Sequence, residues 1–244
     1  MNPRLLLRSR LARVAALPAA LLFIATTCTE PTSSPLIGDD PEPQFSAGEA
    51  SYETFVGAGD IASCTVAGDE RTAQLLDDIA GTVFTLGDNA YPNGRAEDYA
   101  SCYEPSWGRH KARTYAALGN HEYDTGTADA SFDYFGDRVG PRGLGYYSFD
   151  LGFWHIIVLN DNAPYVPFKA NSAQDRWLQA DLAGNTKRCI LAIWHQPRFY
   201  SSKDPGGSTE STSRKIFWDR LYAAGVDLVM SGHRHQYERF APIQ

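Results

Sequence analysis

The chain has 244 residues, 43% of them hydrophobic, and a formal net charge of −7. This length and apolar content are sufficient for one full hydrophobic core, which excludes a chain that is disordered beyond its N-terminus. The charge falls to −11 once the four arginines of residues 1–28 are removed. Such an acidic chain has no electrostatic footprint for nucleic acid, so we expect no nucleic-acid partner.

Residues 1–28 are predicted to be a signal peptide. Four arginines and no acidic residue precede an apolar run over 14–25, which is too short to span a bilayer comfortably. Cys28 follows Ala-Thr-Thr, which permits a lipoprotein cleavage site with a lipid anchor at Cys28, or an ordinary signal cleavage site. Residues 29–51 are rich in Pro, Ser and acidic residues and predict a flexible linker. We therefore expect an exported protein with one folded domain over residues 52–244.

Strands and helices alternate along this domain. Apolar runs predict strands over 53–60, 82–89, 113–120, 188–195 and 226–233, and a hairpin over 144–160 that turns at Leu151-Gly152. Amphipathic patterns predict helices over 69–81, 172–185 and 211–225. Asp69 and Ser172 are the expected N-caps, and Gly225 the expected end of the last helix. This alternation predicts an α/β layered fold, and the hairpin makes its sheet mixed.

Five of the predicted strands end in polar side chains that could bind metal. These side chains are Asp60, Asp88, Asn120 with His121, His195, and His233 with His235. Each alone is compatible with a turn residue, a helix cap or a structural histidine. Ligands of open α/β sheets bind outside the carboxyl ends of the strands, so we expect the five sets to converge. Together they offer too many donors for one ion, and carboxylate with imidazole suits iron, zinc or manganese in a two-metal hydrolytic site.

Five short motifs carry a resemblance to a known family. In chain order they are GD at 59–60, GDNAY at 87–91, GNHE at 119–122, WHQP at 194–197 and GHRHQYER at 232–239. This ordered set resembles the calcineurin-like metallophosphoesterases, and specifically their purple acid phosphatase branch. The resemblance implies an α/β/β/α sandwich of two mixed sheets and covers the chain from about residue 53 to its end.

The resemblance also implies a role for each site residue. The first metal would be bound by Asp60, Tyr91 and His235, the second by Asn120, His195 and His233, and Asp88 would bridge both. Tyr91 would bind as a phenolate to ferric iron; it fills the place of a histidine that many relatives have where this chain has Ala62. A packing tyrosine is the alternative for Tyr91. His121 would bind no metal but would contact the phosphate as a catalytic residue.

These assignments predict an exported phosphoesterase with two metals, iron paired with zinc, iron or manganese. It would hydrolyse small phosphate monoesters by attack of a metal-bound hydroxide. A phosphodiesterase or nucleotide hydrolase of the same fold is one alternative. A catalytically silent metal- or phosphate-binding fragment is another, because the chain ends nine residues after His235 whereas relatives usually continue. The oligomeric state is not predicted.

Several other residues have predictions of their own. Cys64 and Cys102, in loops that follow two of the motifs, are expected to form a disulfide, leaving Cys189 as a buried thiol. His110 is expected on the surface, and His155 as a hydrogen-bonded structural histidine. Glu122 and Tyr123 are expected to support the GNHE loop. Tyr237, Glu238 and Arg239 are expected to pack against or orient the last histidines. The polar segment over 197–213 is expected to form a rim that selects substrates.

Overall fold

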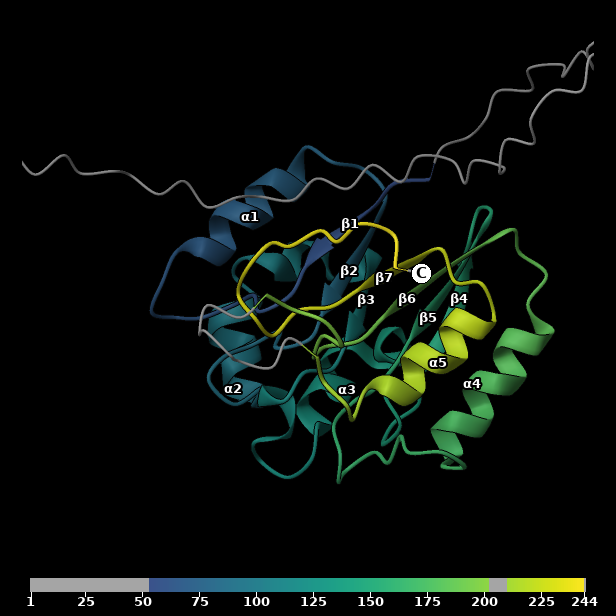
Figure 1. Ribbon diagram of the computed structural model, residues 1–244. Helices are drawn as coiled ribbons and strands as arrows, with labels where there is room; N and C mark the ends of the chain where they lie inside the picture. Colours follow the sequence, from purple (N-terminus) through teal and green to yellow (C-terminus); the bar gives the residue numbers. More distant parts are fainter. Residues whose placement is uncertain (1–52, 202–209, 244) are drawn as a thin grey trace, which may run out of the picture.

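The computed structural model describes residues 53–201 and 210–243 (Figure 1). The predicted signal peptide, linker and lipid anchor at Cys28 lie outside these residues. The strands are β1 (Phe55–Ala58), β2 (Thr82–Leu86), β3 (Thr114–Ala117), β4 (Tyr147–Leu151), β5 (Trp154–Val158), β6 (Cys189–Ile193) and β7 (Leu228–Met230). The α-helices are α1 (Gly68–Asp77), α2 (Ala96–Asp98), α3 (Asp129–Phe135), α4 (Ala173–Gly184) and α5 (Lys215–Ala223). Shorter helical segments are η1 (Tyr99–Tyr103), η2 (Trp107–Arg113), η3 (His121–Tyr123) and η4 (Gly136–Val139).

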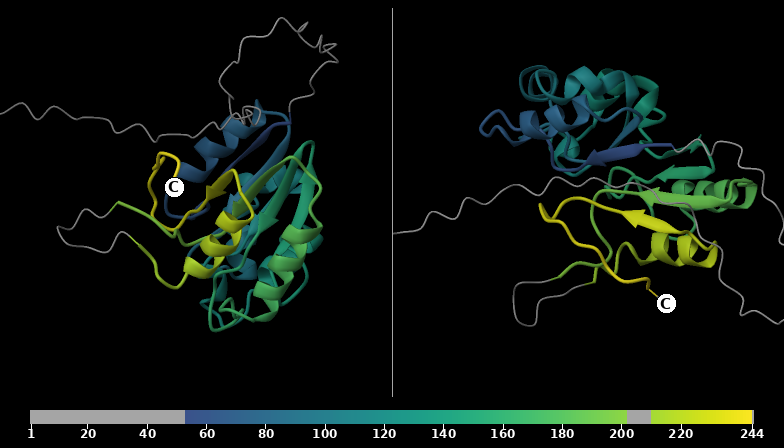
Figure 2. Two further views of the ribbon diagram at one scale, coloured as in Figure 1. Left: turned by 45° about the vertical axis from the view of Figure 1, so that its right-hand side comes forward. Right: turned by 90° about the horizontal axis from the view of Figure 1, so that it is seen from above.

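The strands form two sheets. The first has the order β1-β2-β3 and is parallel throughout. The second has the order β4-β5-β6-β7, in which β4 and β5 form the expected antiparallel hairpin and the other pairs are parallel. Figure 2 shows α1 on one side of the two sheets and α4 with α5 on the other. The predicted α/β/β/α sandwich is confirmed, although only the second of its sheets is mixed in the described strands.

The apolar strands bury both faces. On β6, Leu191 and Ile193 point between the sheets, where they join Phe55 and Phe84 of the first sheet. Their neighbours Ile190 and Ala192 point outward, to the core beneath α4 and α5. Successive residues of a strand face opposite sides, so a strand covered on both faces becomes an unbroken apolar run. Strands of this kind can therefore be predicted from their apolar runs alone.

The helix ends agree with the sequence at two of three points. The Ser172 hydroxyl caps α4 by accepting a hydrogen bond from the Asp175 backbone N–H. Gly225 follows α5 with a φ of +72°, a conformation in which glycine carries no steric cost. The prediction that Asp69 caps the first helix is wrong: α1 begins at Gly68 and Asp69 lies in its first turn. There it still favours the helix through its charge near the N-terminus.

Two of the predictions for cysteine and histidine need correction. Cys64 and Cys102 form the expected disulfide, but Cys189, although buried, is disulfide-bonded and therefore not a free thiol. The predicted surface position of His110 is also wrong. Its ring is buried against α1, with Nε2 3.0 Å from an Asp77 carboxylate oxygen. The charged neighbours that suggested exposure belong to η2, which packs its histidine inward.

No helix within residues 53–201 and 210–243 has both the length and the apolar character needed to cross a bilayer.

His155 on β5 is the hydrogen-bonded structural histidine that the sequence predicted. Its Nδ1 lies 2.9 Å from an Asp150 carboxylate oxygen, and its Nε2 lies 2.9 Å from Asp181 on α4. Burial lowers the pKa of this ring, but the hydrogen bonds to Asp150 and Asp181 outweigh burial and raise the pKa above its usual 6.5. Where the ring is protonated, the imidazolium links β4, β5 and α4.

Replacing His155 with glutamine should lower stability in a pH-dependent way. Because the folded-state pKa is raised, the contribution of the imidazolium is complete below pH 6.5 and is lost as the pH rises through the folded-state pKa. We expect a loss of about 1–2 kcal/mol at pH 5.5, since one partner is half-exposed, and a smaller loss at pH 9. Urea unfolding of both proteins in the two buffers measures this. An equal difference in both would show that packing, not charge, is the role of His155.

Candidate metal centre

The structure brings all seven predicted metal ligands to one rim, at the carboxyl ends of strands from both sheets. Asp60 follows β1, Asp88 follows β2, and Asn120 follows β3. His195 follows β6, and the pair of histidines in GHRH follows β7. The two sheets are packed together, so β1, β2 and β3 of one meet β6 and β7 of the other at this rim.

Three candidate ligands gather at one end of the rim. The Tyr91 hydroxyl lies 3.0 Å from Nε2 of His235 and 3.2 Å from Oδ1 of Asp60. Nε2 of His235 is also 3.3 Å from the same Asp60 oxygen. The other oxygen of Asp60 accepts a hydrogen bond of 2.8 Å from the His233 backbone N–H, which fixes the carboxylate. This group offers a carboxylate, a phenol and an imidazole to one ion.

A second group lies at the other end. Nε2 of His195 is 3.1 Å from Oδ1 of Asn120 and 3.2 Å from Nδ1 of His233. Nδ1 of His195 lies 2.7 Å from the Leu86 carbonyl oxygen, to which it can donate. That hydrogen bond places the proton on Nδ1 and leaves Nε2 to face the cluster, as is usual for histidines that bind metal.

Asp88 belongs to both groups. Its Oδ2 lies 3.3 Å from the Tyr91 hydroxyl and 3.1 Å from Nε2 of His195. Asp88, His195 and His233 each present a ligand atom within 4.8 Å of the others. The seven side chains thus form two donor sets that share one carboxylate, the arrangement needed to hold two ions side by side.

Burial and charge shift the pKa values of several side chains of the site. Burial lowers the pKa of His195, but the hydrogen bond and charge of Asp88 outweigh burial and raise that pKa to about 9. Burial, followed by the nearby His195, lowers the pKa of His233 to about 4. Burial and the two aspartates raise the pKa of Tyr91 far above its usual value. Asp88 thus favours positive charge on its neighbour His195, whereas burial and His195 disfavour a proton on His233, and Tyr91 can ionise only beside a strong cation.

The backbone is unusual at four of the seven positions. The φ angles are +56° at Asp60, +51° at Asp88, +72° at His233 and +49° at His235. Side chains other than glycine rarely adopt this region, and such residues cluster at functional sites. Here the left-handed residues turn the chain sharply as it leaves a strand, which directs the side chain into the rim.

The glycines that precede the ligands give the carboxylates room. A Cβ on Gly119 would lie 2.1 Å from Oδ1 of Asp88, and a Cβ on Gly232 would lie 2.8 Å from Oδ2 of Asp60. Both are closer than real Cβ contacts. The G-N and G-H pairs of the motifs therefore reflect close approach of one strand end to the ligand of another.

Glu122 anchors the backbone beneath the site. The fully buried carboxylate accepts hydrogen bonds from the N–H groups of Gly119 at 2.6 Å, Asp88 at 3.0 Å and Asn89 at 2.7 Å. Burial, followed by the charge of Asp88, raises its pKa to about 7. Glu122 therefore supports the GNHE loop by joining the end of β2 to the end of β3.

His121 stands beside the donor sets rather than within them. Its Nδ1 lies 2.5 Å from the Pro92 carbonyl oxygen and 3.2 Å from an Asp124 oxygen. Its Nε2 is 3.9 Å from Oδ2 of Asp88, and a third of the side chain is exposed. With Nδ1 donating to Pro92, Nε2 is directed at the rim and remains accessible to a substrate.

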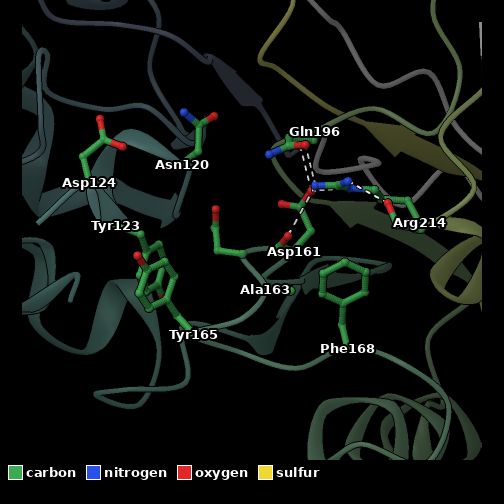
Figure 3. Close-up of a pocket in the computed structure, with 11 residues that line it drawn as sticks. Asn120, Tyr123, Asp124, Asp161, Ala163, Tyr165, Phe168, Gln196 and Arg214 are labelled. Carbon is green, nitrogen blue, oxygen red and sulfur yellow. Dashed lines mark hydrogen bonds and ion pairs between the residues drawn. The ribbon is translucent and has the colours of Figure 1, made fainter. Parts of the chain in front are cut away.

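A cavity of about 370 Å³ opens beside Asn120 (Figure 3). Gln196, which follows His195 in the sequence, and Asp124, which contacts the His121 ring, both line it. So do Asp161 and Arg214, which sequence reasoning missed. These two residues are 53 positions apart and belong to no motif, whereas Asn120, within GNHE, and Gln196, within WHQP, lie in motifs that the sequence singled out.

The predicted substrate-selecting rim over 197–213 is only partly described. Ser201 donates its backbone N–H to the Glu238 carboxylate at 3.0 Å, so Glu238 ties the loop after β6 to the segment after β7. Residues 202–209 of the predicted substrate-selecting rim lie outside the described residues.

The chain is similar to proteins named as acid phosphatases. Purple acid phosphatase 15 of Arabidopsis thaliana is 27% identical over 204 residues, which are 70% of this chain and 38% of that protein. Acid phosphatase type 7 of Homo sapiens is 34% identical over 144 residues, which are 51% of this chain and 32% of that protein. The chain thus spans well under half the length of these relatives.

The same fold occurs in a purple acid phosphatase, PPD1, from yellow lupin (Lupinus luteus) seeds. The TM-score is 0.57 at 21% identity, over 73% of this chain and 37% of that one. The protein-family model described as calcineurin-like phosphoesterase matches residues 54–237, from β1 to the segment after His235. Because this match includes every strand and every candidate ligand, the chain belongs to the calcineurin-like phosphoesterase family, and within it resembles the purple acid phosphatases.

Proposed function

We propose that this chain is a two-metal phosphoesterase that hydrolyses phosphate monoesters. The observation that carries the proposal is the division of seven donors into two sets that share Asp88. A mononuclear or purely structural site has no need of such a bridge. The similarity to proteins named as purple acid phosphatases and as an acid phosphatase supports the same substrate class.

The two donor sets fit different ions. Asp60, Tyr91 and Asp88 give the first set three oxygen donors besides His235, a composition that favours a hard trivalent ion such as ferric iron. Asn120, His195 and His233, together with Asp88, suit a divalent ion, for which zinc, iron and manganese are our candidates. When bound, the pair would supply Lewis-acid charge for the phosphate oxygens and a lowered pKa for water.

The protein's own residues complete the chemistry. His121 would hold the phosphate and place a proton from Nε2 on the departing oxygen, since Nδ1 is already engaged by Pro92. Asp124, in contact with the same ring, would fix its orientation. Glu122 would hold the ends of β2 and β3 in register, so that Asp88 and Asn120 stay in place.

We also propose that the protein acts outside the cytoplasm. The arginine-rich start and the short apolar run of residues 14–25 support export, and the Cys64–Cys102 disulfide is compatible with an oxidising compartment. Because the mature chain would be acidic, we do not expect a nucleic-acid substrate.

The proposal is tested by turnover of 4-nitrophenyl phosphate, with bis(4-nitrophenyl) phosphate as the matched diester. We expect the full chain, reconstituted with iron and zinc, to hydrolyse the monoester faster than the diester. Protein stripped of metal by a chelator should be inactive in both assays. A faster diester reaction would favour a phosphodiesterase, and no turnover by folded, two-metal protein would favour a binding role.

A further inference from the structure

The cavity beside Asn120 lies on the side of the candidate metal centre where His121 stands. Asp124, whose carboxylate is 3.2 Å from the His121 ring, lines this cavity. So do Asn120 of the second donor set and Gln196, which follows His195. If His121 protonates the departing oxygen, the organic part of the ester must leave from this side. At about 370 Å³, the cavity has room for a small organic group.

One wall of the cavity is an aromatic platform. Tyr165, which is 49% exposed, stacks on Tyr123, with ring centroids 4.9 Å apart and planes inclined by 16°. Tyr123 is buried, and its hydroxyl accepts a hydrogen bond of 2.7 Å from the Asn160 side chain. The buried ring of Phe168 lies across the cavity from the tyrosines in Figure 3, where the Arg214 guanidinium is 5.7 Å from its centroid. Tyr165 thus presents an accessible flat face on a rigid support.

The opposite wall contains a cation whose charge is already compensated. The Nε of Arg214 donates to the buried Asp161 carboxylate at 2.9 Å, and its Nη2 donates to Gln196. Figure 3 shows this network facing the two tyrosines across the cavity. The backbone N–H of Gln196 also donates to Asp161, at 3.1 Å. With Asp124 adding a negative charge at the rim, the described residues that line the cavity include no unpaired cation for a second phosphate or carboxylate.

From these features we infer that the cavity is the leaving-group subsite and that it selects flat, uncharged aromatic groups. The preferred substrates would be aryl phosphate monoesters rather than alkyl phosphates. Tyr165 is then a specificity residue, because its exposed face stacks on the ring of the leaving group. The inference rests on the proposed phosphatase function, whose site it shares.

The test compares phenyl with ethyl compounds in the full chain and in its Tyr165→Ala variant. One readout is the ratio of kcat/KM for phenyl phosphate over ethyl phosphate, which removes general effects on turnover. The other is the ratio of the Kd values for ethylphosphonate and phenylphosphonate, measured by calorimetry, because these analogues cannot be hydrolysed. Stacking of one ring predicts that Tyr165→Ala lowers both ratios about fivefold.

Two further variants complete the test. Tyr165→Phe keeps the ring and should keep both ratios, whereas Tyr222→Ala removes an exposed tyrosine on α5 that does not line the cavity, and serves as the matched control. Unchanged ratios in Tyr165→Ala would overturn the inference even if both esters are hydrolysed. Absence of all turnover would count against the phosphatase proposal, while the phosphonate affinities would still test the subsite.

Discussion

Replacing Asp88 with alanine should remove both activity and the paired metals. Its Oδ2 approaches both donor sets, at 3.3 Å from Tyr91 and 3.1 Å from His195. Without it each ion loses a ligand and the charge that offsets its neighbour. Since loss of a mere supporting hydrogen bond at a metal site costs about 10–100-fold in affinity, we expect more than about 100-fold here. Elemental analysis of the purified variant and its 4-nitrophenyl phosphate turnover measure the two effects.

His121→Ala is the matched control for Asp88→Ala, because it removes a neighbouring group that belongs to neither donor set. Its backbone N–H, which donates to Oδ1 of Asp88 at 2.9 Å, is retained in the variant. We expect turnover to fall by about 10²–10⁴-fold, the range for loss of a general acid, with metal content nearly unchanged. Equal metal loss in the two variants would contradict the separate roles of Asp88 and His121.

Replacing Glu122 with alanine should have the largest effect on stability. Three backbone N–H groups lose their acceptor in a buried place, and each unsatisfied donor costs about 1–3 kcal/mol. Some relaxation will recover part of this, so we expect a loss of about 3–5 kcal/mol. The backbone of Asp88 is released as well, and metal binding should weaken with it. Urea unfolding of metal-free protein isolates the stability effect from the binding effect.

Glu122→Gln serves as the control for Glu122→Ala. It keeps the volume and one acceptor oxygen but replaces the other oxygen with a donor. The bonds from Asp88 and Gly119 share Oε2, and the bond from Asn89 uses Oε1. The glutamine variant should therefore lie between the wild type and alanine. If alanine and glutamine were equally stable, packing would explain the position of Glu122 better than its hydrogen bonds do.

The order of strands and helices was predictable because the central strands, of which β6 is buried at every position, are covered on both faces. Leu191 and Ile193 face one core and Ile190 and Ala192 the other, so the run is apolar without interruption. The convergence of the candidate ligands was also predictable, since all of them follow strands at the same edge. Their division into two sets with Asp88 between them came from the resemblance, and the distances are compatible with it.

Other features depend on packing that no local pattern reports. The burial of His110 results from the docking of η2 on α1, and its charged sequence neighbours pointed the other way. The bond between Asp161 and Arg214 joins a loop after β5 to the start of α5, so it exists only once both are folded. Cys189 was expected to be a free thiol, and nothing in its local sequence indicates that it is disulfide-bonded.

The left-handed backbone at Asp60, Asp88, His233 and His235 bears on how the protein could change over time. Each such residue carries a conformational cost of about 1–3 kcal/mol, which glycine would relieve at once. Selection for thermal stability alone would therefore reward substitutions at these positions, and each of them would delete a donor. Heat resistance and catalysis are opposed at this rim, so a more robust variant must gain its stability elsewhere in the two sheets and their helices.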